Sequence, residues 1–326
     1  MTTTSKISLI LCVRDAEEYV GTAVKSLERQ VDDPNQLEVI LINDGSSDAT
    51  GDVLRYFGDR LPHCTVIDNE TAGGIALARN HGMSIARGEH IVFMDGDDWL
   101  APGRLQVLSD SLDALEVDMV RTDHVTVTDY RREMRTAPFP RRNVAQNPRD
   151  GILPLDESSM VDYPYTWAGM FHRRLYDQGL LEMDPELFTA EDRPWIWRLF
   201  LQAGSFAVVD APYYCYRRAV STSLTQVRDA RQLHFIPAFE RTRELVEADP
   251  DADVFLPKLA RTSLAIAELH LSKASKMSKE DREALREGVQ RLVDGFPRQL
   301  IADALDDSPG LRRYRMARYA RRAVGS

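Results

Sequence analysis

Three carboxylates lie within four residues, at Asp95, Asp97 and Asp98, directly after the apolar run from His90 to Met94. Carboxylates this crowded repel one another, so they stay ionised only where a cation neutralises them. Carboxylate oxygens without clustered thiolates or imidazoles favour Mg²⁺ or Mn²⁺, which keep coordination positions open for the oxygens of a diphosphate. The alternative is an acidic turn whose aspartates cap a helix starting near Pro102. Spacing alone leaves both interpretations open.

A second acidic turn follows the apolar run from Leu37 to Asn43. Gly45 permits a tight turn, and Ser47 or Asp48 can cap the helix that follows. Asp44 can then accept hydrogen bonds from a ligand, and a carboxylate pairs well with the imide N–H of uracil, a donor that cytosine lacks. Taken alone, Asp44 is explained equally well as a turn residue.

A third candidate is the stretch that contains Gly73, Gly74 and Arg79. Paired glycines let the backbone approach phosphate, but their spacing matches neither a dinucleotide-binding motif nor a P-loop. Arg79 falls on a predicted helix, where an arginine is usually solvated or salt-bridged. Between two acidic strand ends, its guanidinium can instead bridge an aspartate and a phosphate.

These residues are positioned by strands and helices that alternate over the first 130 residues. The predicted strands are Ile7 to Val13, Leu37 to Asn43, Thr65 to Asp68, His90 to Met94 and Asp118 to Thr128. The predicted helices are Glu17 to Gln30, Ser47 to Phe57, Gly73 to Arg87 and Pro102 to Leu115. The pattern predicts an α/β fold with a mainly parallel sheet and helices on both faces. In such sheets ligands bind outside the carboxyl ends of the strands.

The rest of the chain changes character twice. Residues 131–163 are rich in proline and predict a loop-rich crossover, after which we expect a helix from Glu191 to Ala203 and an aromatic strand from Phe206 to Tyr216. From about Asp229 onward leucine and alanine recur at helical spacing and strand signals vanish. We therefore expect a catalytic domain at 1–228 and a helical C-terminal region at 229–326.

Taken in order, these elements resemble the inverting glycosyltransferases of family 2, whose nucleotide-sugar-binding fold is called GT-A. The resemblance covers about residues 6–225. It is carried by residues 9–20, Asn43 to Asp48, Ala78-Arg79-Asn80 with Gly82, Phe93 to Asp98, Gly169 to Arg174, Glu191-Asp192 and Tyr213 to Arg217.

The resemblance implies a nucleotide-sugar site made by Val13, Asp15, Asp44, Arg79, Asp95, Gly96, Arg217 and Ser223. Val13 and Asp44 would hold the base of a uridine nucleotide. Asp95 would contact the ribose or the metal, and Asp97 would ligate a Mn²⁺ or Mg²⁺ ion that bridges the diphosphate and stabilises the departing nucleotide. Arg217 and Ser223 are expected to touch the diphosphate or the acceptor.

The resemblance also implies that the acidic pair Glu191-Asp192 carries the general base, and we assign it to Asp192. A carboxylate there would take the proton of the acceptor hydroxyl as that hydroxyl attacks the anomeric carbon. Without the resemblance, both residues are explained as first-turn acids that complement a helix dipole.

Two stretches depart from the family pattern. Arg14-Asp15 stands where Tyr-Asn is usual. Residues 218–223 stand where a short glycine and serine loop is common.

Composition excludes several other classes. The 41 basic and 51 acidic residues give a net charge of −10, so we expect no nucleic-acid partner. The three cysteines lie far apart and predict neither a disulfide framework nor a thiolate zinc site. No apolar stretch approaches the roughly 20 residues that cross a bilayer, and we expect a cytoplasmic protein.

The sequence therefore predicts a metal-dependent inverting glycosyltransferase of hexosyltransferase type, with a UDP-sugar donor. Its acceptor would be a glycan, a polyol-phosphate polymer or another envelope or secondary-metabolite hydroxyl. A non-catalytic nucleotide-sugar or carbohydrate-binding module is the alternative, although the acidic clusters are intact. A sugar nucleotidyltransferase fits less well, because Asp15, Glu17 and Glu18 stand where its triphosphate would bind.

Six arginines between Arg312 and Arg322 form the last feature, with no acid among those eleven residues. If the stretch is helical, an apolar face with flanking arginines is the pattern of a helix lying on an anionic membrane. It would then bring the protein to the inner face of the membrane. A terminal helix packed on the rest of the chain, with solvated arginines, is the alternative.

Overall fold

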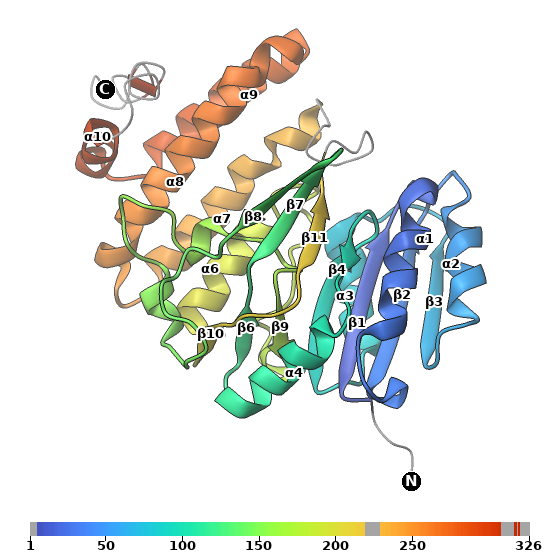
Figure 1. Cartoon of the computed structure of the whole chain (residues 1–326). Helices are drawn as coiled ribbons and strands as arrows, with labels where there is room; N and C mark the ends of the chain where they lie inside the picture. Colours follow the sequence, from blue (N-terminus) through green and yellow to red (C-terminus); the bar gives the residue numbers. More distant parts are fainter. Residues whose placement is uncertain (1–4, 219–228, 308–315, 318, 320–326) are drawn as a thin grey trace. The chain divides into compact units, whose positions relative to one another are not determined.

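The computed structural model describes residues 5–218, 229–307, 316, 317 and 319 (Figure 1). Their contacts divide into two compact units, each built from separated stretches of chain. The first unit comprises residues 5–148, 165–186 and 202–218, and the second comprises 149–164, 187–201 and the described residues from 229 onward. The predicted division into a catalytic domain at 1–228 and a helical region at 229–326 stays a prediction.

The first unit is built on a seven-stranded sheet with the order β10-β6-β9-β4-β1-β2-β3. Only β9 runs antiparallel to its neighbours. The strands are β1 (Ile7–Val13), β2 (Leu37–Asp44), β3 (Cys64–Asn69), β4 (His90–Asp95), β6 (Met119–Arg121), β9 (Gly169–His172) and β10 (Phe206–Val208). Every residue of β1 and β2 is buried, as expected for central parallel strands covered on both faces.

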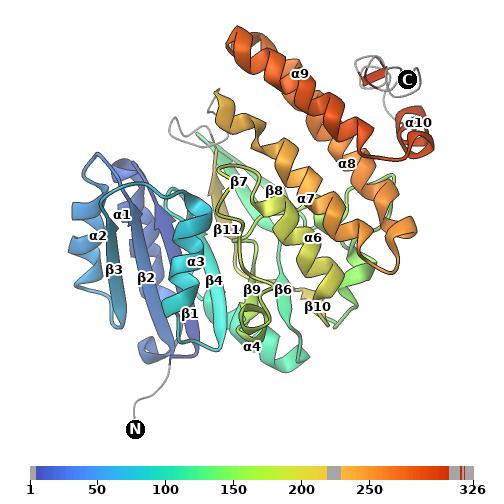
Figure 2. The ribbon, with the colours of Figure 1, turned by 180° about the vertical axis from the view of Figure 1, so that it is seen from behind.

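Helices cover both faces of this sheet. They are α1 (Glu17–Lys25), α2 (Thr50–Gly58), α3 (Ile75–Ile85), α4 (Arg104–Leu115) and the short α5 (Arg174–Asp177). Figures 1 and 2 show α1, α2 and α4 on one face and α3 on the other. The α/β class predicted from the alternating pattern is confirmed.

The strand order places a crevice where ligands usually bind. From β1 the chain moves outward through β2 to β3, and it then returns to place β4 on the opposite side of β1. In open α/β sheets, ligands bind in the crevice outside the carboxyl ends of the strands at such a change of direction. Val13 ends β1 and Asp95 ends β4, so both lie at this crevice.

A second sheet in the same unit has the order β5-β11-β7-β8. Its strands are β5 (Trp99–Leu100), β7 (His124–Thr128), β8 (Arg131–Arg135) and β11 (Tyr214–Arg217). The continuous strand expected at 118–128 was wrong, because β6 ends at Arg121 in the large sheet and β7 begins at His124 in the small one. The expected strand at 206–216 divides in the same way into β10 and β11. Strand β8 was not predicted, because all five of its residues are exposed. Its sequence therefore lacks the alternation of apolar and polar residues that marks a half-buried strand.

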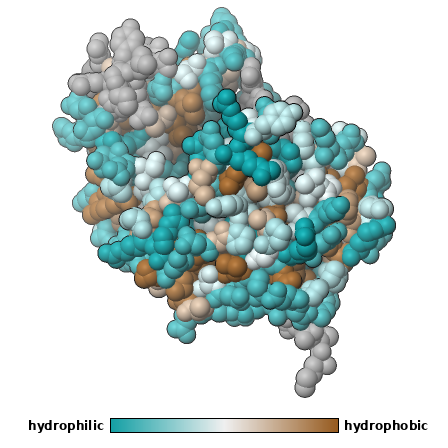
Figure 3. All heavy atoms as spheres, in the orientation of Figure 1, coloured by the Kyte–Doolittle hydropathy of each residue, from teal (hydrophilic) through white to brown (hydrophobic). Residues whose placement is uncertain are grey.

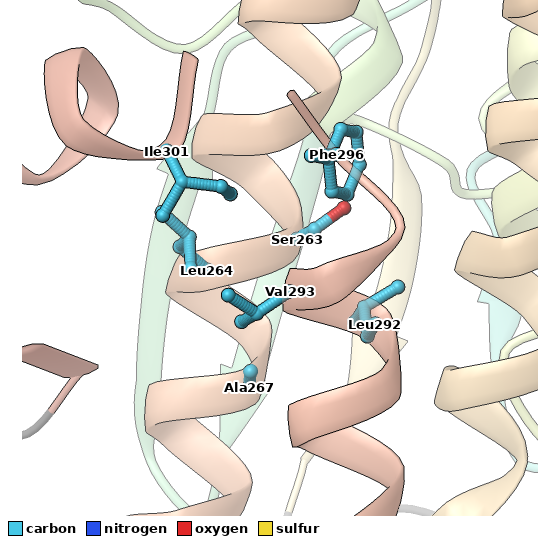
Figure 4. A pocket seen from close by; sticks show the side chains of 7 residues that line it. All are labelled: Ser263, Leu264, Ala267, Leu292, Val293, Phe296 and Ile301. Carbon is cyan, nitrogen blue, oxygen red and sulfur yellow. The ribbon is translucent and has the colours of Figure 1, made fainter. Parts of the chain in front are cut away.

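The second unit is helical. It contains nearly all of α6 (Asp192–Gln202), and α7 (Phe235–Glu247), α8 (Ala252–Lys273), α9 (Lys279–Asp294) and α10 (Arg298–Asp306). Ser278 caps α9 by accepting a hydrogen bond from the Asp281 amide. Figure 4 shows a small space between α8, α9 and the start of α10. The Ser263 hydroxyl there has no partner within the described residues, and the space is too small for a water molecule, so it is a packing defect rather than a ligand site.

Apolar side chains are mostly in the interior. On the face shown in Figure 3, hydrophobic residues form small groups between hydrophilic ones. None of the helices in the described part of the chain combines the length and apolar character that a bilayer span requires. The three cysteines are unpaired, and burial raises the pKa of Cys12 to about 12 and that of Cys64 to about 11, so these thiols stay protonated.

Candidate active site

The crevice between β1 and β4 depends on a close contact between their ends. A Cβ atom on Gly96 would lie 2.3 Å from the Val13 Cγ2 atom, closer than real side chains approach. Only glycine therefore lets the turn after β4 pack against the last residue of β1. This contact brings together two residues that the sequence assigned to the nucleotide site.

Asp44, at the end of β2, organises the turn before α3. Its Oδ1 accepts a hydrogen bond from the Gly73 amide at 2.9 Å, and its Oδ2 accepts one from the Gly74 amide at 2.8 Å. The Asn69 side chain also donates to Oδ1, at 3.3 Å. The side chain is buried, and these donors account for its orientation. The proposed contact to a uracil base stays a prediction.

Asp15 ties the turn after β1 to the turn after β2. Its Oδ1 accepts a hydrogen bond from the Ser47 amide at 2.7 Å, and its own amide donates to the Ser46 hydroxyl at 2.9 Å. Arg14 lies 3.3 Å from the other carboxylate oxygen and offsets part of its negative charge. Both of these charged side chains are substantially exposed, so their ion pair contributes little to stability.

Arg79 reaches the crevice from α3. Its guanidinium donates to Asp95 Oδ1 at 2.7 Å, and only 6% of the Arg79 side chain is exposed. The neighbouring Asn80 fixes this helix by exchanging hydrogen bonds with the main chain of Met183. The arginine therefore neutralises the carboxylate that ends β4, which is half of the bridging role expected from the sequence.

Asp97 differs from Asp95 and Asp98 in the hydrogen bonds of its carboxylate. No other residue of the described chain donates a hydrogen bond to its carboxylate, and only its main-chain oxygen is held, by Arg217 Nε at 2.8 Å. Burial and the nearby charge of Asp95 raise the pKa of Asp97 to about 6. A carboxylate that lacks donors and lies close to a second carboxylate is a favourable place for a cation.

Asp98 is fully buried and held within the protein. Its Oδ2 accepts a hydrogen bond from the Tyr214 hydroxyl at 2.8 Å, and its Oδ1 accepts one from the Arg217 amide at 2.7 Å. Burial, together with the charges of Asp97 and Asp95, raises its pKa well above the usual range. Burial and the neighbouring Asp98 also raise the pKa of Tyr214, which keeps the hydroxyl protonated as a donor.

The Arg217 guanidinium lies between two aromatic rings at the end of β11. Its centre is 4.9 Å from the Tyr19 ring and 4.8 Å from the Trp99 ring. Cation–π contacts of this kind hold an arginine in place without using up its hydrogen-bond donors. Ser223, the other residue predicted in this stretch, lies outside the described residues.

The carboxylates allow a test of whether a divalent ion fits. Within the described residues no group of three or more His, Cys, Asp or Glu side chains forms a metal centre. Asp98 is occupied by Tyr214 and the Arg217 amide, which leaves Asp97 and Asp95, the latter paired with Arg79, as the carboxylates of this turn that a cation could use. Two carboxylates suit Mg²⁺ or Mn²⁺, which take their remaining oxygens from water and from phosphates of a substrate. The donor set therefore fits the expected ion.

Glu191 and Asp192 belong to the second unit. Asp192 is the first residue of α6, Glu191 is buried, and Arg193 Nε lies 3.9 Å from Asp192 Oδ1. Ala190, just before them, has a φ of 61°, a left-handed conformation that a non-glycine residue adopts only when its surroundings enforce it. The acidic pair thus stands at a helix N-terminus, as predicted, and follows a strained residue.

Residues 8–179, more than half of the chain, match the family model described as "Glycosyl transferase family 2". The chain belongs to glycosyl transferase family 2. The match covers the elements from β1 to α5 and includes Asp44, Arg79, Asp95 and Asp97. The roles given to Asp192 and Arg217 lie outside the matched residues and rest on the reasoning above.

Two curated relatives of this family 2 protein come from Bacillus subtilis strain 168. The "uncharacterized glycosyltransferase EpsJ" is 27% identical over 223 residues, which is 68% of this chain and 63% of the relative. The "putative glycosyltransferase EpsH" is 30% identical over 228 residues, which is 67% of this chain and 62% of the relative. The chain therefore spans less than two thirds of the length of either relative.

Solved structures support the same fold. The crystal structure of residues 1–349 of Staphylococcus aureus TarS in complex with UDP-GlcNAc has a TM-score of 0.77 and 20% sequence identity. The alignment covers 98% of this chain and 88% of that one. At this identity the likeness shows the fold, which agrees with the GT-A architecture expected from the sequence.

Sequence reasoning missed four residues that shape the site of this family 2 protein. They are Tyr19, Asp98, Trp99 and Tyr214. Asp98 was counted only as part of the acidic cluster, Tyr19 and Tyr214 lay in stretches that carry the family resemblance but were given no role, and Trp99 was given none either. A buried Tyr that follows an acidic turn by more than 100 residues gives no local signal, because the partners meet only through the sheet.

Proposed function

We propose that this chain is a metal-dependent inverting glycosyltransferase that moves a sugar from a UDP-sugar to a hydroxyl acceptor. The observation that carries the proposal is the Asp97 carboxylate, which accepts no hydrogen bond from another described residue and lies beside Asp95 and Arg217 at the carboxyl ends of the strands. Membership of glycosyl transferase family 2 supports the reaction class. The UDP and UDP-GlcNAc complexes of the structural neighbour TarS support a uridine nucleotide donor.

The donor would lie across the β1–β4 crevice. Val13 and Asp44 would contact the uracil, and Arg79 would hold Asp95 in place while lining the same pocket. Asp97, with Asp95, would hold Mn²⁺ or Mg²⁺, which when bound supplies Lewis acidity to the departing diphosphate. The restrained Arg217 guanidinium would add a fixed positive charge for the same leaving group.

Asp192 would act as the general base on the acceptor hydroxyl, and Glu191 is the next candidate. A base that takes the proton while the hydroxyl attacks from the face opposite the nucleotide inverts the anomeric carbon. A UDP-α-sugar should then give a β-linkage, and analysis of the product linkage by NMR tests this. A retained configuration would contradict the proposed mechanism.

The acceptor class is suggested by the names of relatives from envelope pathways. One is a poly(ribitol-phosphate) beta-glucosyltransferase of Bacillus spizizenii, 31% identical over 96 residues, and another is the minor teichoic acid biosynthesis protein GgaB of Bacillus subtilis, 29% identical over 115 residues. We propose a glycan or a polyol-phosphate polymer as acceptor. Screening a panel of UDP-sugars for hydrolysis, and then polymers for transfer, would identify both substrates.

The decisive variant is Asp192→Asn. It should lower the rate of transfer by about 10² to 10⁴ while leaving UDP affinity nearly unchanged, because a positioned base contributes to the chemical step and not to nucleotide binding. Glu191→Gln is the matched comparison, with the neighbouring acid removed instead. If Asp192→Asn transfers sugar at the parental rate, the base lies elsewhere. A wild-type protein that binds UDP but neither transfers nor hydrolyses any UDP-sugar would favour a non-catalytic binding module.

The arginine-rich segment from Arg312 to Arg322 lies almost entirely outside the described residues, and its role stays a prediction. Each arginine near an anionic bilayer contributes about 1 kcal/mol of binding free energy. Six arginines would therefore be enough to hold a protein there reversibly. Flotation with anionic and neutral liposomes tests this. Equal binding by a chain that ends at Gly310 would rule out the segment as an anchor.

A further inference from the structure

Four hydrogen bonds join the acidic turn after β4 to strand β11. The Tyr214 hydroxyl donates to Asp98 Oδ2 at 2.8 Å and accepts from the Asp95 amide at 3.1 Å. Asp98 Oδ1 accepts from the Arg217 amide at 2.7 Å, and Arg217 Nε donates to the Asp97 main-chain oxygen at 2.8 Å. We call Asp98, Tyr214 and Arg217 the turn clamp.

The clamp is itself held rigidly. Tyr214 is 1% exposed, and its ring stacks on Trp167 with centroids 4.1 Å apart and planes inclined by 10°. Arg104 donates to the main-chain oxygen of Pro212, just before β11, at 2.7 Å. A buried hydroxyl and a buried carboxylate are costly unless both are hydrogen-bonded, and here each satisfies the other. The clamp therefore favours one arrangement of the turn.

The clamp fixes the backbone on both sides of Asp97. No other described residue donates to its carboxylate, so its direction depends on the residues on either side of it. Asp95 is fixed at its amide by the Tyr214 hydroxyl, and Asp98 is fixed at both carboxylate oxygens. The same clamp sets the end of β11, from which the Arg217 guanidinium projects between Tyr19 and Trp99.

We propose that Tyr214 and Asp98 are positioning residues that hold the Asp97 carboxylate and the Arg217 guanidinium in fixed relation, so that one cation and one diphosphate can be bound together. This inference rests on the function proposed above. Outer groups that orient metal-binding carboxylates typically change metal affinity by about 10- to 100-fold when removed. A residue that only fills the core would instead change stability and leave ion affinity unaltered.

Tyr214→Phe tests the inference, because it removes one hydroxyl and keeps the ring that stacks on Trp167. Tyr216→Phe is the matched control: it lies two residues along β11, its ring is 5.1 Å from Trp167, and its hydroxyl makes no hydrogen bond with a described residue. Mn²⁺ affinity of each folded protein with UDP present is measured by calorimetry, and bound Mn²⁺ is examined by electron paramagnetic resonance. Thermal midpoints and kcat at saturating Mn²⁺ are recorded alongside.

We expect Tyr214→Phe to weaken Mn²⁺ binding by about 10- to 100-fold and to alter the resonance spectrum of the bound ion, with kcat largely recovered at saturating Mn²⁺. Tyr216→Phe should match the wild type in both. Asp98→Asn should resemble Tyr214→Phe, and the double variant should lose less than the product of the two single effects, because the two residues share the hydrogen bond between the Tyr214 hydroxyl and Asp98 Oδ2.

The outcomes separate the inference from the proposed function. If the wild type binds no Mn²⁺ with UDP, metal dependence itself fails. If the wild type binds Mn²⁺ and both phenylalanine variants bind it equally well, the positioning role is overturned. It is also overturned if Tyr214→Phe lowers only the thermal midpoint while Mn²⁺ affinity and the resonance spectrum stay unchanged.

Discussion

The turns that follow β2 and β4 look alike in sequence and differ in structure. Each begins with Asp-Gly at the carboxyl end of a buried parallel strand, as Asp44-Gly45 and Asp95-Gly96. In the first turn the leading carboxylate receives two backbone amides, from Gly73 and Gly74. In the second turn the leading carboxylate is paired with a guanidinium, and the next one, Asp97, receives no donor from any other described residue.

The two glycines are also required for different reasons. Gly45 has a φ of 66°, and a Cβ there would lie 2.4 Å from the Ala72 amide nitrogen. Gly96 instead has to be small because Val13 packs against it. The comparison shows that two similar acidic turns can differ in the donors that the fold supplies to their carboxylates. The turn after β2 is largely satisfied internally, whereas the Asp97 carboxylate after β4 accepts no hydrogen bond from another described residue.

The largest expected effect is that of Asp97→Asn. It should reduce kcat/KM for sugar transfer by about 10³, since a metal ion contributes several kcal/mol to stabilising the leaving group. The thermal midpoint in EDTA should not fall, because no other residue in the described part of the chain donates to this carboxylate. Steady-state kinetics and calorimetric melting measure the two quantities. A folded Asp97→Asn protein with full activity would remove the distinction between the two turns.

An intermediate effect is expected for Asp44→Asn. The amide would place its NH₂ group against one of the two backbone amides of Gly73 and Gly74, leaving donors facing each other. A buried donor without an acceptor costs about 1–3 kcal/mol, so the free energy of unfolding in urea should fall by that amount. Asp97→Asn serves as the control. If Asp44→Asn is as stable as the wild type, the turn after β2 does not depend on these contacts.

The smallest effect is expected for Asp15→Asn. Asparagine keeps the Oδ1 acceptor that receives the Ser47 amide, so the change in the free energy of unfolding should stay within about 0.5 kcal/mol. Loss of one negative charge near the crevice should strengthen UDP binding slightly, by about 2-fold, and more at low salt. Titrations of UDP at two salt concentrations measure this. Weaker UDP binding would assign Asp15 a direct role in the donor site.

The central strands of the large sheet and the acidic turns that follow them could be predicted from the sequence. The apolar runs at Ile7–Val13, Leu37–Asn43 and His90–Met94 are long, β-rich and bounded by turn residues, so they predict central strands to within one residue. The acidic residues that follow two of these strands could be placed at one edge of the sheet by the parallel topology alone. That was enough to locate Asp44, Asp95 and Asp97.

What could not be predicted depended on contacts between distant residues. The stretch 118–128 passes from one sheet to another within two residues, and nothing in its composition marks Thr122 and Asp123 as the break. The donors to Asp44 and Asp98 come from other elements, so the sequence could not separate an internally satisfied carboxylate from one that lacks donors. Arg217 was expected at the site, but its aromatic supports, Tyr19 and Trp99, became apparent only in three dimensions.

Binding of UDP measured by titration calorimetry, with Mn²⁺ and then with EDTA, tests the central claim most directly. The account predicts tight binding with Mn²⁺, a loss of affinity of at least about 10-fold in EDTA, and weaker binding of GDP than of UDP under both conditions. Asp97→Asn should bind UDP with the same low affinity in either buffer. Equal UDP affinity with Mn²⁺ and with EDTA in the wild type, or tighter binding of GDP, would contradict the account.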